Sequence, residues 1–151
     1  MKKIAIKYGL IIALVAAAWV IVAHSLVTNL QSIIHTLGTP VFFNVALFIG
    51  IFLGISAFRR QSDDEATFKQ SLKTGVWISL VYSIAIALFF AVVLLVLGTR
   101  WMGVEAGAQQ LPMRLVALQA FLGLFLGSML FGLGYSALIA FFLSKRLPKA
   151  T

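Results

Sequence analysis

The chain has 151 residues, of which 62% are hydrophobic and only 11% are charged, and its formal net charge is +8. Soluble domains carry roughly a quarter charged residues, and a domain of this size buries only about 60 to 70% of the surface that its unfolded chain exposes. A soluble domain therefore cannot hide this much apolar surface, and lipid must be the solvent. The sequence has no cysteine, which excludes disulfides, iron–sulfur clusters and thiolate chemistry.

Four apolar stretches are each long enough to span the hydrocarbon layer, which takes about 20 residues of helix. They cover residues 8–27, 41–58, 75–97 and 115–143. Helices are expected because unpaired backbone groups are costly in lipid and because the stretches lack the alternating pattern of barrel strands. We predict an all-α integral membrane four-helix bundle that forms one domain over residues 1–151.

The start of the chain, MKKIAIKYGLIIALVAAAWVIVA, also resembles a secretory signal. It has a basic beginning, an apolar run, and the small residues Ala16 and Ala18 where cleavage would occur. The apolar run continues beyond those alanines and is long enough to span a membrane. An uncleaved first helix is therefore the favoured interpretation, and a signal peptide is the alternative.

The positions of lysine and arginine predict the orientation of the bundle. If the N-terminus is cytoplasmic, ten of the twelve basic residues lie on that side, and only Arg100 and Arg114 lie outside. This asymmetry is the positive-inside bias of membrane proteins. We predict that both termini and the loop 59–74 are cytoplasmic and that the loops 28–40 and 98–114 are on the outer side. Because the basic residues flank apolar runs, no nucleic acid is expected as a partner.

The charged loop 59–74 contains signals for a helix start. Ser62 and Glu65 have the spacing of a capping box, and Asp63 and Asp64 place negative charge at the positive end of a new helix. The third helix is therefore predicted to begin near Asp63, before the membrane. Its inward apolar face is predicted to consist of Phe68, Leu72 and Val76.

The two predicted outer loops contain further helix boundaries. Leucine and isoleucine residues keep helical spacing after residue 27, so the first helix is expected to protrude until Gly38 and Pro40 stop it. Pro112 is suited to the start of the fourth helix. Trp101 is interpreted as an outer interface anchor, and Trp77 and Tyr8 as inner ones.

Small residues recur every four positions in all four stretches, which would let helix backbones approach closely. The longest run is Gly75, Ser79, Ser83, Ala87 and Ala91 in the third stretch. The fourth stretch has Gly123 and Gly127, then Ser128, Gly132, Ser136 and Ala140. The segments KYGLIIALV at 7–15 and KTGVWISLV at 73–81 also align, and duplication and chance both remain open as explanations.

No Asp, Glu, Lys or Arg falls inside a predicted span, which argues against a proton-coupled pump. His24, Asn44 and Gln119 lie toward the outer ends of their helices, and we predict an interhelical hydrogen-bonded cluster of these three. Gln119 is expected to face a neighbouring helix because it follows the Gly123 and Gly127 stripe. A deeper set is interpreted as packed seams more than as a pore lining: Ser79, Tyr82, Ser83, Ser128, Tyr135 and Ser136.

The remaining charged residues suggest contacts with lipid. Inner-leaflet contacts with anionic lipid are a further hypothesis, set against plain positive-inside placement. The residues concerned are Arg59, Arg60, Lys69, Lys145 and Arg146. No nucleophile with a base, metal-ligand set or phosphate loop is recognised, so we expect no enzyme activity, no cofactor and no metal.

The segment GIFLGISAFRRQSDDEATFKQSLKTGVWISLV, with the start KYGLIIAL, resembles the domain of unknown function family 4199, which consists of small four-helix membrane proteins. The family pattern F-x-x-A-x-K-T-G before the third helix is matched at Phe68, Lys73, Thr74 and Gly75, with Ser71 in place of alanine. The resemblance implies a bacterial inner-membrane protein and assigns no activity.

We therefore expect a non-enzymatic membrane protein with a structural or accessory role. Membrane lipids, a second copy or another membrane protein would be its partners. The alternative is a small transporter or channel for a neutral or weakly polar solute. A polar cavity lined by residues such as Tyr82, Ser128 or Asn44 and open to one side would favour transport, and a dry, closely packed interior would favour the structural role.

Overall fold

The structure is a computed structural model that describes residues 1–26, 37–62, 66–98 and 112–144. These residues form four α-helices: α1 (Lys2–Leu26), α2 (Thr39–Gln61), α3 (Phe68–Leu97) and α4 (Met113–Ser144). All four are long and apolar enough to cross a membrane. The prediction of an all-α chain with four long apolar helices is confirmed, and each helix contains or nearly contains the corresponding predicted span.

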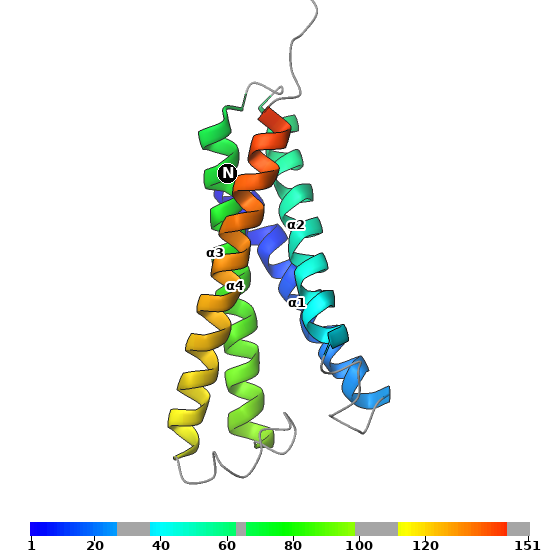
Figure 1. The fold of residues 1–151 in the computed structure, drawn as a ribbon, viewed down its shortest axis with the longest axis vertical. Coiled ribbons are helices and arrows are strands. Elements are labelled where there is room, and N and C mark those ends of the chain that lie inside the picture. Colours follow the sequence, from blue (N-terminus) through cyan, green and yellow to red (C-terminus); the bar gives the residue numbers. More distant parts are fainter. Residues whose placement is uncertain (27–36, 63–65, 99–111, 145–151) are drawn as a thin grey trace, which may run out of the picture.

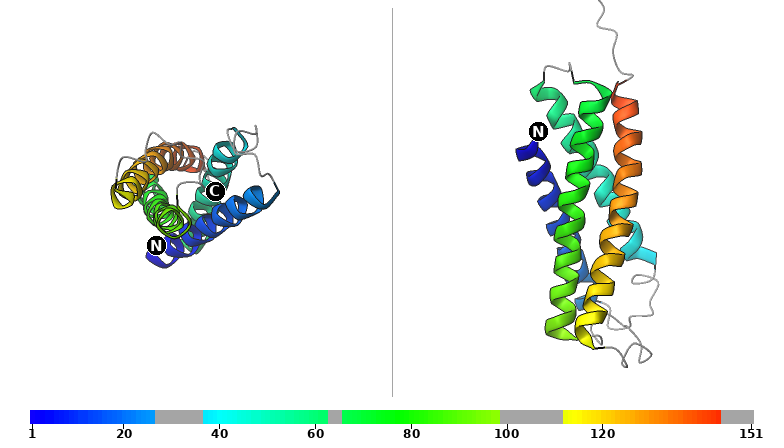
Figure 2. Two further views of the ribbon diagram at one scale, coloured as in Figure 1. Left: turned by 90° about the horizontal axis from the view of Figure 1, so that it is seen from below. Right: turned by 90° about the vertical axis from the view of Figure 1, so that its left-hand side faces the viewer.

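The helices run up and down, so that chain neighbours are antiparallel (Figure 1). The N-terminal part of α1, the end of α2, the start of α3 and the end of α4 lie toward one end of the bundle, here named the closed end. The opposite end, named the open end, holds the end of α1, the start of α2, the end of α3 and the start of α4. Both described chain ends thus lie toward the closed end (Figures 1 and 2).

The two hairpins are arranged as a V. Helices α3 and α4 lie side by side along their length, whereas α1 and α2 diverge from them toward the open end (Figures 1 and 2). The core connects the two arms with branched aliphatic side chains from all four helices, including Ile12, Ile51, Ile55, Ile78 and Ile139. Each of these is at most 3% exposed, so the arms are held together where the V is narrow.

Helix α3 begins later than the sequence predicts. Thr67 is its N-cap: the Thr67 hydroxyl accepts a hydrogen bond from the Gln70 amide at 3.3 Å, and the Thr67 amide donates to Gln70 Oε1 at 2.9 Å. Ser62 instead ends α2, with its amide donating to the Arg59 carbonyl at 2.9 Å. The predicted capping box at Ser62 is therefore wrong; residues 63–65 lie outside the described residues. Threonine and glutamine at the same spacing supply the reciprocal pair instead.

The first turns of α3 bury small residues. Phe68 is 41% exposed, whereas Ser71, Thr74 and Gly75 are buried. Phe68, Leu72 and Val76 are therefore not the face that is buried inside the bundle, and their placement at the headgroup level with the apolar face inward stays a prediction. Packing in this region is governed by side-chain size, because small residues let α4 come close, and in lipid a large apolar side chain has no need to be buried.

Prolines mark the starts of two helices. Pro40 lies in the first turn of α2, with Gly38 as the N-cap, so these residues begin a helix. The predicted extension of α1 up to Gly38 falls mainly on residues 27–36, outside the described residues. Pro112 precedes α4, and its carbonyl accepts from the Leu115 amide at 2.8 Å, as predicted from its position. Gly98 ends α3 with φ of 78°, a conformation that favours glycine.

Candidate functional site

The contact between α3 and α4 is a seam of small residues, here named the α3–α4 seam and defined as Gly75, Ser79, Gly132 and Ser136. Ser79 and Ser136 are both 0% exposed, and their hydroxyl oxygens are 3.4 Å apart. A Cβ placed on Gly75 would lie 2.7 Å from the Ser136 Cβ, well inside van der Waals contact. The seam therefore has no room for larger side chains. This confirms the predicted packing role of the small residues in α3 and in the second half of α4.

The hydroxyls of Ser79 and Ser136 donate hydrogen bonds to carbonyls of their own helices. Ser79 donates to the Gly75 carbonyl at 2.9 Å, and Ser136 donates to the Gly132 carbonyl at 2.6 Å. Ser83, one turn further along α3, is also fully buried, but its hydroxyl has no hydrogen-bond partner among the described residues. None of these hydroxyls lines the cavity described next, so this part of the interior is packed and not a polar passage.

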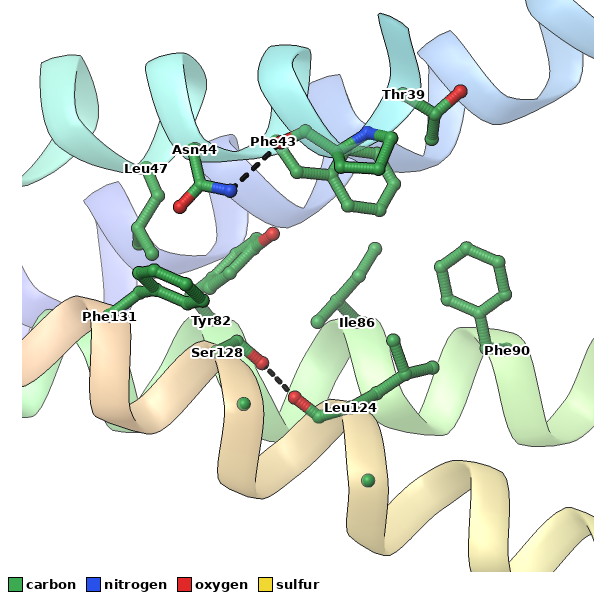
Figure 3. Close-up of a pocket in the computed structure, with 13 residues that line it drawn as sticks. Thr39, Phe43, Asn44, Leu47, Tyr82, Ile86, Phe90, Leu124, Ser128 and Phe131 are labelled. Atoms are coloured by element: carbon green, nitrogen blue, oxygen red, sulfur yellow. Dashed lines mark hydrogen bonds between the residues drawn. The ribbon is translucent and has the colours of Figure 1, made fainter. Parts of the chain in front are cut away.

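A cavity of about 370 Å³ lies between α2, α3 and α4, on the open-end side of the V (Figure 3). It lies where the hairpins diverge, next to the first part of α2, the second part of α3 and the first half of α4. Its walls are mainly aliphatic and aromatic. The lining residues, named here the cavity residues, are Thr39, Pro40, Phe43, Asn44, Leu47, Tyr82, Ile86, Phe90, Gly123, Leu124, Gly127, Ser128 and Phe131.

Gly123 and Gly127 form part of the cavity wall on α4. No atom of the described residues lies within 4 Å of the position that a Cβ would take on either glycine. The sequence-based expectation that this stripe packs against a neighbouring helix is therefore wrong. The same spacing that closes the seam further along α4 leaves an open space here, because α2 has moved away from α4 at this level.

The polar cavity residues differ in how many hydrogen bonds their side chains make. Asn44 donates from Nδ2 to the Pro40 carbonyl at 2.9 Å, and its Oδ1 accepts from the Tyr135 hydroxyl at 2.9 Å. Ser128 donates to the carbonyl of Leu124 within its own helix. Tyr82 is 2% exposed, yet its hydroxyl makes no hydrogen bond to the described part of the chain.

The predicted cluster of His24, Asn44 and Gln119 is not assembled as expected. Gln119 is exposed on α4, so the expectation that it faces a neighbouring helix is wrong. Asn44 instead pairs with Tyr135, which connects α2 to α4 at 91 residues' separation. His24 is half-buried near the end of α1 and has a contact of its own. The exposure of Gln119 agrees with the open space that Gly123 and Gly127, on the same face of α4, meet at this level.

The basic residues at the closed end do not all share one environment. Arg59 is 6% exposed, and its Nη1 donates to the Ala66 carbonyl at 3.1 Å. It therefore ties together the two sides of the α2–α3 connection and is not placed for the lipid contact suggested from the sequence. Arg60 and Lys69 are exposed. Lys145 and Arg146 lie outside the described residues.

The two predicted inner anchors have different exposures. Trp77 is 37% exposed on α3, and Tyr8 is half-buried on α1 with the Lys7 ammonium 5.9 Å from its ring centroid. The predicted outer anchor Trp101 lies outside the described residues. Among the described residues, no group of three His, Asp or Glu side chains is placed to hold a metal ion.

Residues 7–104 match the model of a known family, described as protein of unknown function (DUF4199). The chain belongs to the DUF4199 family. The match covers most of α1 and all of α2 and α3 and ends before α4, so two of the three cavity walls of this DUF4199 protein lie in the matched region. No curated protein and no solved structure matches the chain.

Two features of the site in this DUF4199 protein could not be read from the sequence. The Asn44–Tyr135 hydrogen bond joins two residues that the sequence analysis placed at different depths in the membrane, Asn44 in the outer cluster and Tyr135 in the deeper set. The cavity depends on the divergence of the hairpins, which small-residue spacing does not encode. The fourth stretch changes its register of small residues between Gly127 and Ser128, but both of these residues line the cavity, and close packing begins only at Gly132.

Proposed function

We propose that this DUF4199 protein is a multi-pass protein of the bacterial cytoplasmic membrane with both termini in the cytoplasm. Four apolar helices and the gathering of basic residues toward the closed end support this. Reporter fusions to the two chain ends test the orientation: an enzyme active only in the cytoplasm should be active at both. Activity at one end alone would refute an even number of crossings.

Within the membrane, the protein acts as a non-enzymatic structural or accessory component. The observation that carries this proposal is the α3–α4 seam, where fully buried serines pack against glycines and leave no polar lining. Large apolar side chains such as Leu14, Val96 and Leu130 are more than two-thirds exposed and are available to lipid or to another helix. Close helix packing with an apolar exterior suits a protein that associates laterally.

Native mass spectrometry from a mild detergent tests this role directly. A structural or accessory component should retain a second copy or another membrane protein, in a defined ratio that persists on dilution. A monomer that carries neither would refute the association. Crosslinking in intact membranes before extraction guards against loss of a partner in the detergent.

A second candidate is a transporter for a neutral or weakly polar solute. The cavity favours it, because Tyr82, Ser128 and Asn44 are among its residues and it lies in one half of the bundle only. Purified protein in liposomes should then accelerate uptake of a small neutral solute over empty liposomes. The same uptake with the cavity filled by Gly127→Leu would exclude transport through this cavity.

Lipid contact at the closed end is assigned to the exposed residues Arg60 and Lys69, with Lys145 and Arg146 as further candidates. Arg60 lies in a hollow of about 560 Å³ that also includes Ser56 and Gln61. Basic surfaces on the cytoplasmic side attract anionic headgroups. Replacing Arg60 and Lys69 by glutamine should lower the amount of phosphatidylglycerol that copurifies, and an unchanged amount would refute the assignment.

A further inference from the structure

The hydroxyl of Tyr82 marks the cavity as a place for a ligand. The buried unpaired hydroxyls of the described residues belong to Ser71 and Ser83, so the Tyr82 hydroxyl keeps access to the open space of the cavity that Tyr82 lines. The Tyr82 side chain is 2% exposed, lines the cavity, and has no hydrogen bond to the described residues. Figure 3 shows its hydroxyl directed from α3 toward Phe43 and Asn44 of α2. A group bound in the cavity at this point would supply the missing partner.

The polar groups around Tyr82 indicate which partner would fit. Ser128 donates its hydroxyl proton to Leu124, and the Asn44 side-chain oxygen already accepts from Tyr135. The Tyr82 O–H remains as a donor, and the Asn44 amide has one N–H beyond the one given to Pro40. The Tyr82 O–H and the second Asn44 N–H are thus available as donors, and a ligand with an acceptor oxygen would pair with them.

The remaining walls describe the body of the ligand. Among the residues that the structure describes, no Asp, Glu, Lys, Arg or His lines the cavity, so none of them would neutralise a charged group there. Three phenylalanines, Phe43, Phe90 and Phe131, line the cavity with aliphatic side chains. A volume of about 370 Å³ falls in the range of small-molecule sites. The ligand is therefore uncharged and mainly hydrocarbon.

The depth of Tyr82 separates two sources of such a ligand. Tyr82 lies near the middle of the 30-residue helix α3, on the order of 20 Å from either end at about 1.5 Å per residue. In the membrane placement proposed above, on which this step rests, that depth is inside the hydrocarbon layer. The ester carbonyls of a phospholipid are held near the headgroups and do not reach it. A carbonyl at this depth belongs to a lipid without a headgroup.

We propose that the cavity binds an uncharged, headgroup-free lipid that carries a carbonyl oxygen, such as a long-chain ketone or a quinone. Its carbonyl accepts a hydrogen bond from the Tyr82 hydroxyl, its hydrocarbon body lies between Phe43 and Phe131, and it enters where α2 and α4 diverge. This is a binding site and involves no reaction.

Photo-crosslinking in phospholipid vesicles tests the site with two probes of equal length. One probe is a long-chain ketone bearing a diazirine, and the other carries the same diazirine on a hydrocarbon without the ketone. Because phospholipid is present in excess, it acts as the competitor from the bulk membrane. Mass spectrometry of peptides then shows whether the label lies on cavity residues, and unlabelled ketone is added to test whether labelling is saturable.

Three variants of the full chain give the comparison. Tyr82→Phe removes only the hydroxyl and should lower ketone labelling about 3- to 10-fold, as expected for one hydrogen bond, with no change for the hydrocarbon probe. Gly127→Leu places a side chain in the cavity, where a Cβ meets no atom within 4 Å, and should lower labelling by both probes at least tenfold. Gly134→Leu, on the same helix and outside the cavity residues, is the matched control and should label like the parent.

Two outcomes would overturn the proposal. One is ketone labelling that does not saturate, which would mean that the probe contacts the protein only as part of the bulk lipid. The other is labelling that is equal in the parent, Tyr82→Phe and Gly127→Leu. Membrane insertion is scored separately by the terminal reporter fusions, so a chain that inserts but does not bind refutes the ligand and leaves the membrane assignment standing.

Discussion

Replacing Gly132 by alanine tests the α3–α4 seam most directly. A methyl group on Gly132 would lie 2.5 Å from the Ser79 Cβ, where two carbon atoms normally stay about 3.5–4.0 Å apart. The helices would have to separate by about 1 Å. Ser79 cannot turn away, because it is 0% exposed and bonded to the Gly75 carbonyl. Overpacking of this kind costs about 1–3 kcal/mol.

Gly134→Ala is the matched control, because both glycines lie inside α4 but no atom lies within 4 Å of a Cβ at Gly134. Both variants gain the same helix propensity, about 1 kcal/mol. The difference between them therefore isolates the contact with Ser79. Thermal unfolding in a mild detergent, followed by size-exclusion chromatography, should place Gly132→Ala about 2–12 °C below Gly134→Ala, at about 2–4 °C per kcal/mol for a chain of this size. Equal midpoints, or a higher one for Gly132→Ala, would refute the close-packed seam.

Three further predictions use the same unfolding assay. Arg59→Met should lower the free energy of unfolding by about 1–3 kcal/mol, because it removes the buried donor to the Ala66 carbonyl. Arg60→Met, at the exposed neighbour, should change it by less than about 0.5 kcal/mol. Equal effects of the two variants would contradict the role of Arg59. Thr67→Ala should cost about 1 kcal/mol through loss of the α3 cap, and Thr67→Ser should restore most of it, so a serine variant as weak as alanine would argue against capping. A double-mutant cycle with Asn44→Ala and Tyr135→Phe should give a coupling of about 0.6 kcal/mol, the average for hydrogen bonds between membrane helices, and a coupling near zero would show that the bond is absent in solution.

Much of the fold could be predicted because lipid imposes few choices. Only helices and closed barrels satisfy the backbone in hydrocarbon, so the number and approximate limits of the helices follow from hydropathy. The predicted start of α3 was wrong because two capping signals follow each other closely: Ser62 with Glu65, and Thr67 with Gln70. The first serine is used to end α2, and this choice depends on how tightly the chain turns, which is not a property of the local sequence.

The candidate site was harder to predict for a physical reason. In a soluble protein, hydrophobicity indicates which face of a helix is buried. In a lipid-facing bundle both faces can be apolar, so the size and spacing of side chains do not show whether the face of Gln119 meets another helix. Gly132 and Gly127 both lie among small residues of the fourth stretch, yet a Cβ on Gly132 would meet Ser79, whereas a Cβ on Gly127 would meet no atom of the described residues within 4 Å. The difference is set by the divergence of α2, a property of the whole bundle.

The arrangement of the seam hydroxyls constrains how this surface can change during evolution. Ser79 and Ser136 each donate to a carbonyl of their own helix, and their hydroxyl oxygens approach each other only at the long distance of 3.4 Å, so the two surfaces recognise each other mainly by volume. Glycine, alanine and serine should therefore interchange freely at Ser79 and Ser136, while a single threonine or valine would separate the helices. Substitutions at Ser79 and Ser136 should then be limited to glycine, alanine and serine. A larger residue on α3 would have to appear together with a smaller one at the facing position of α4.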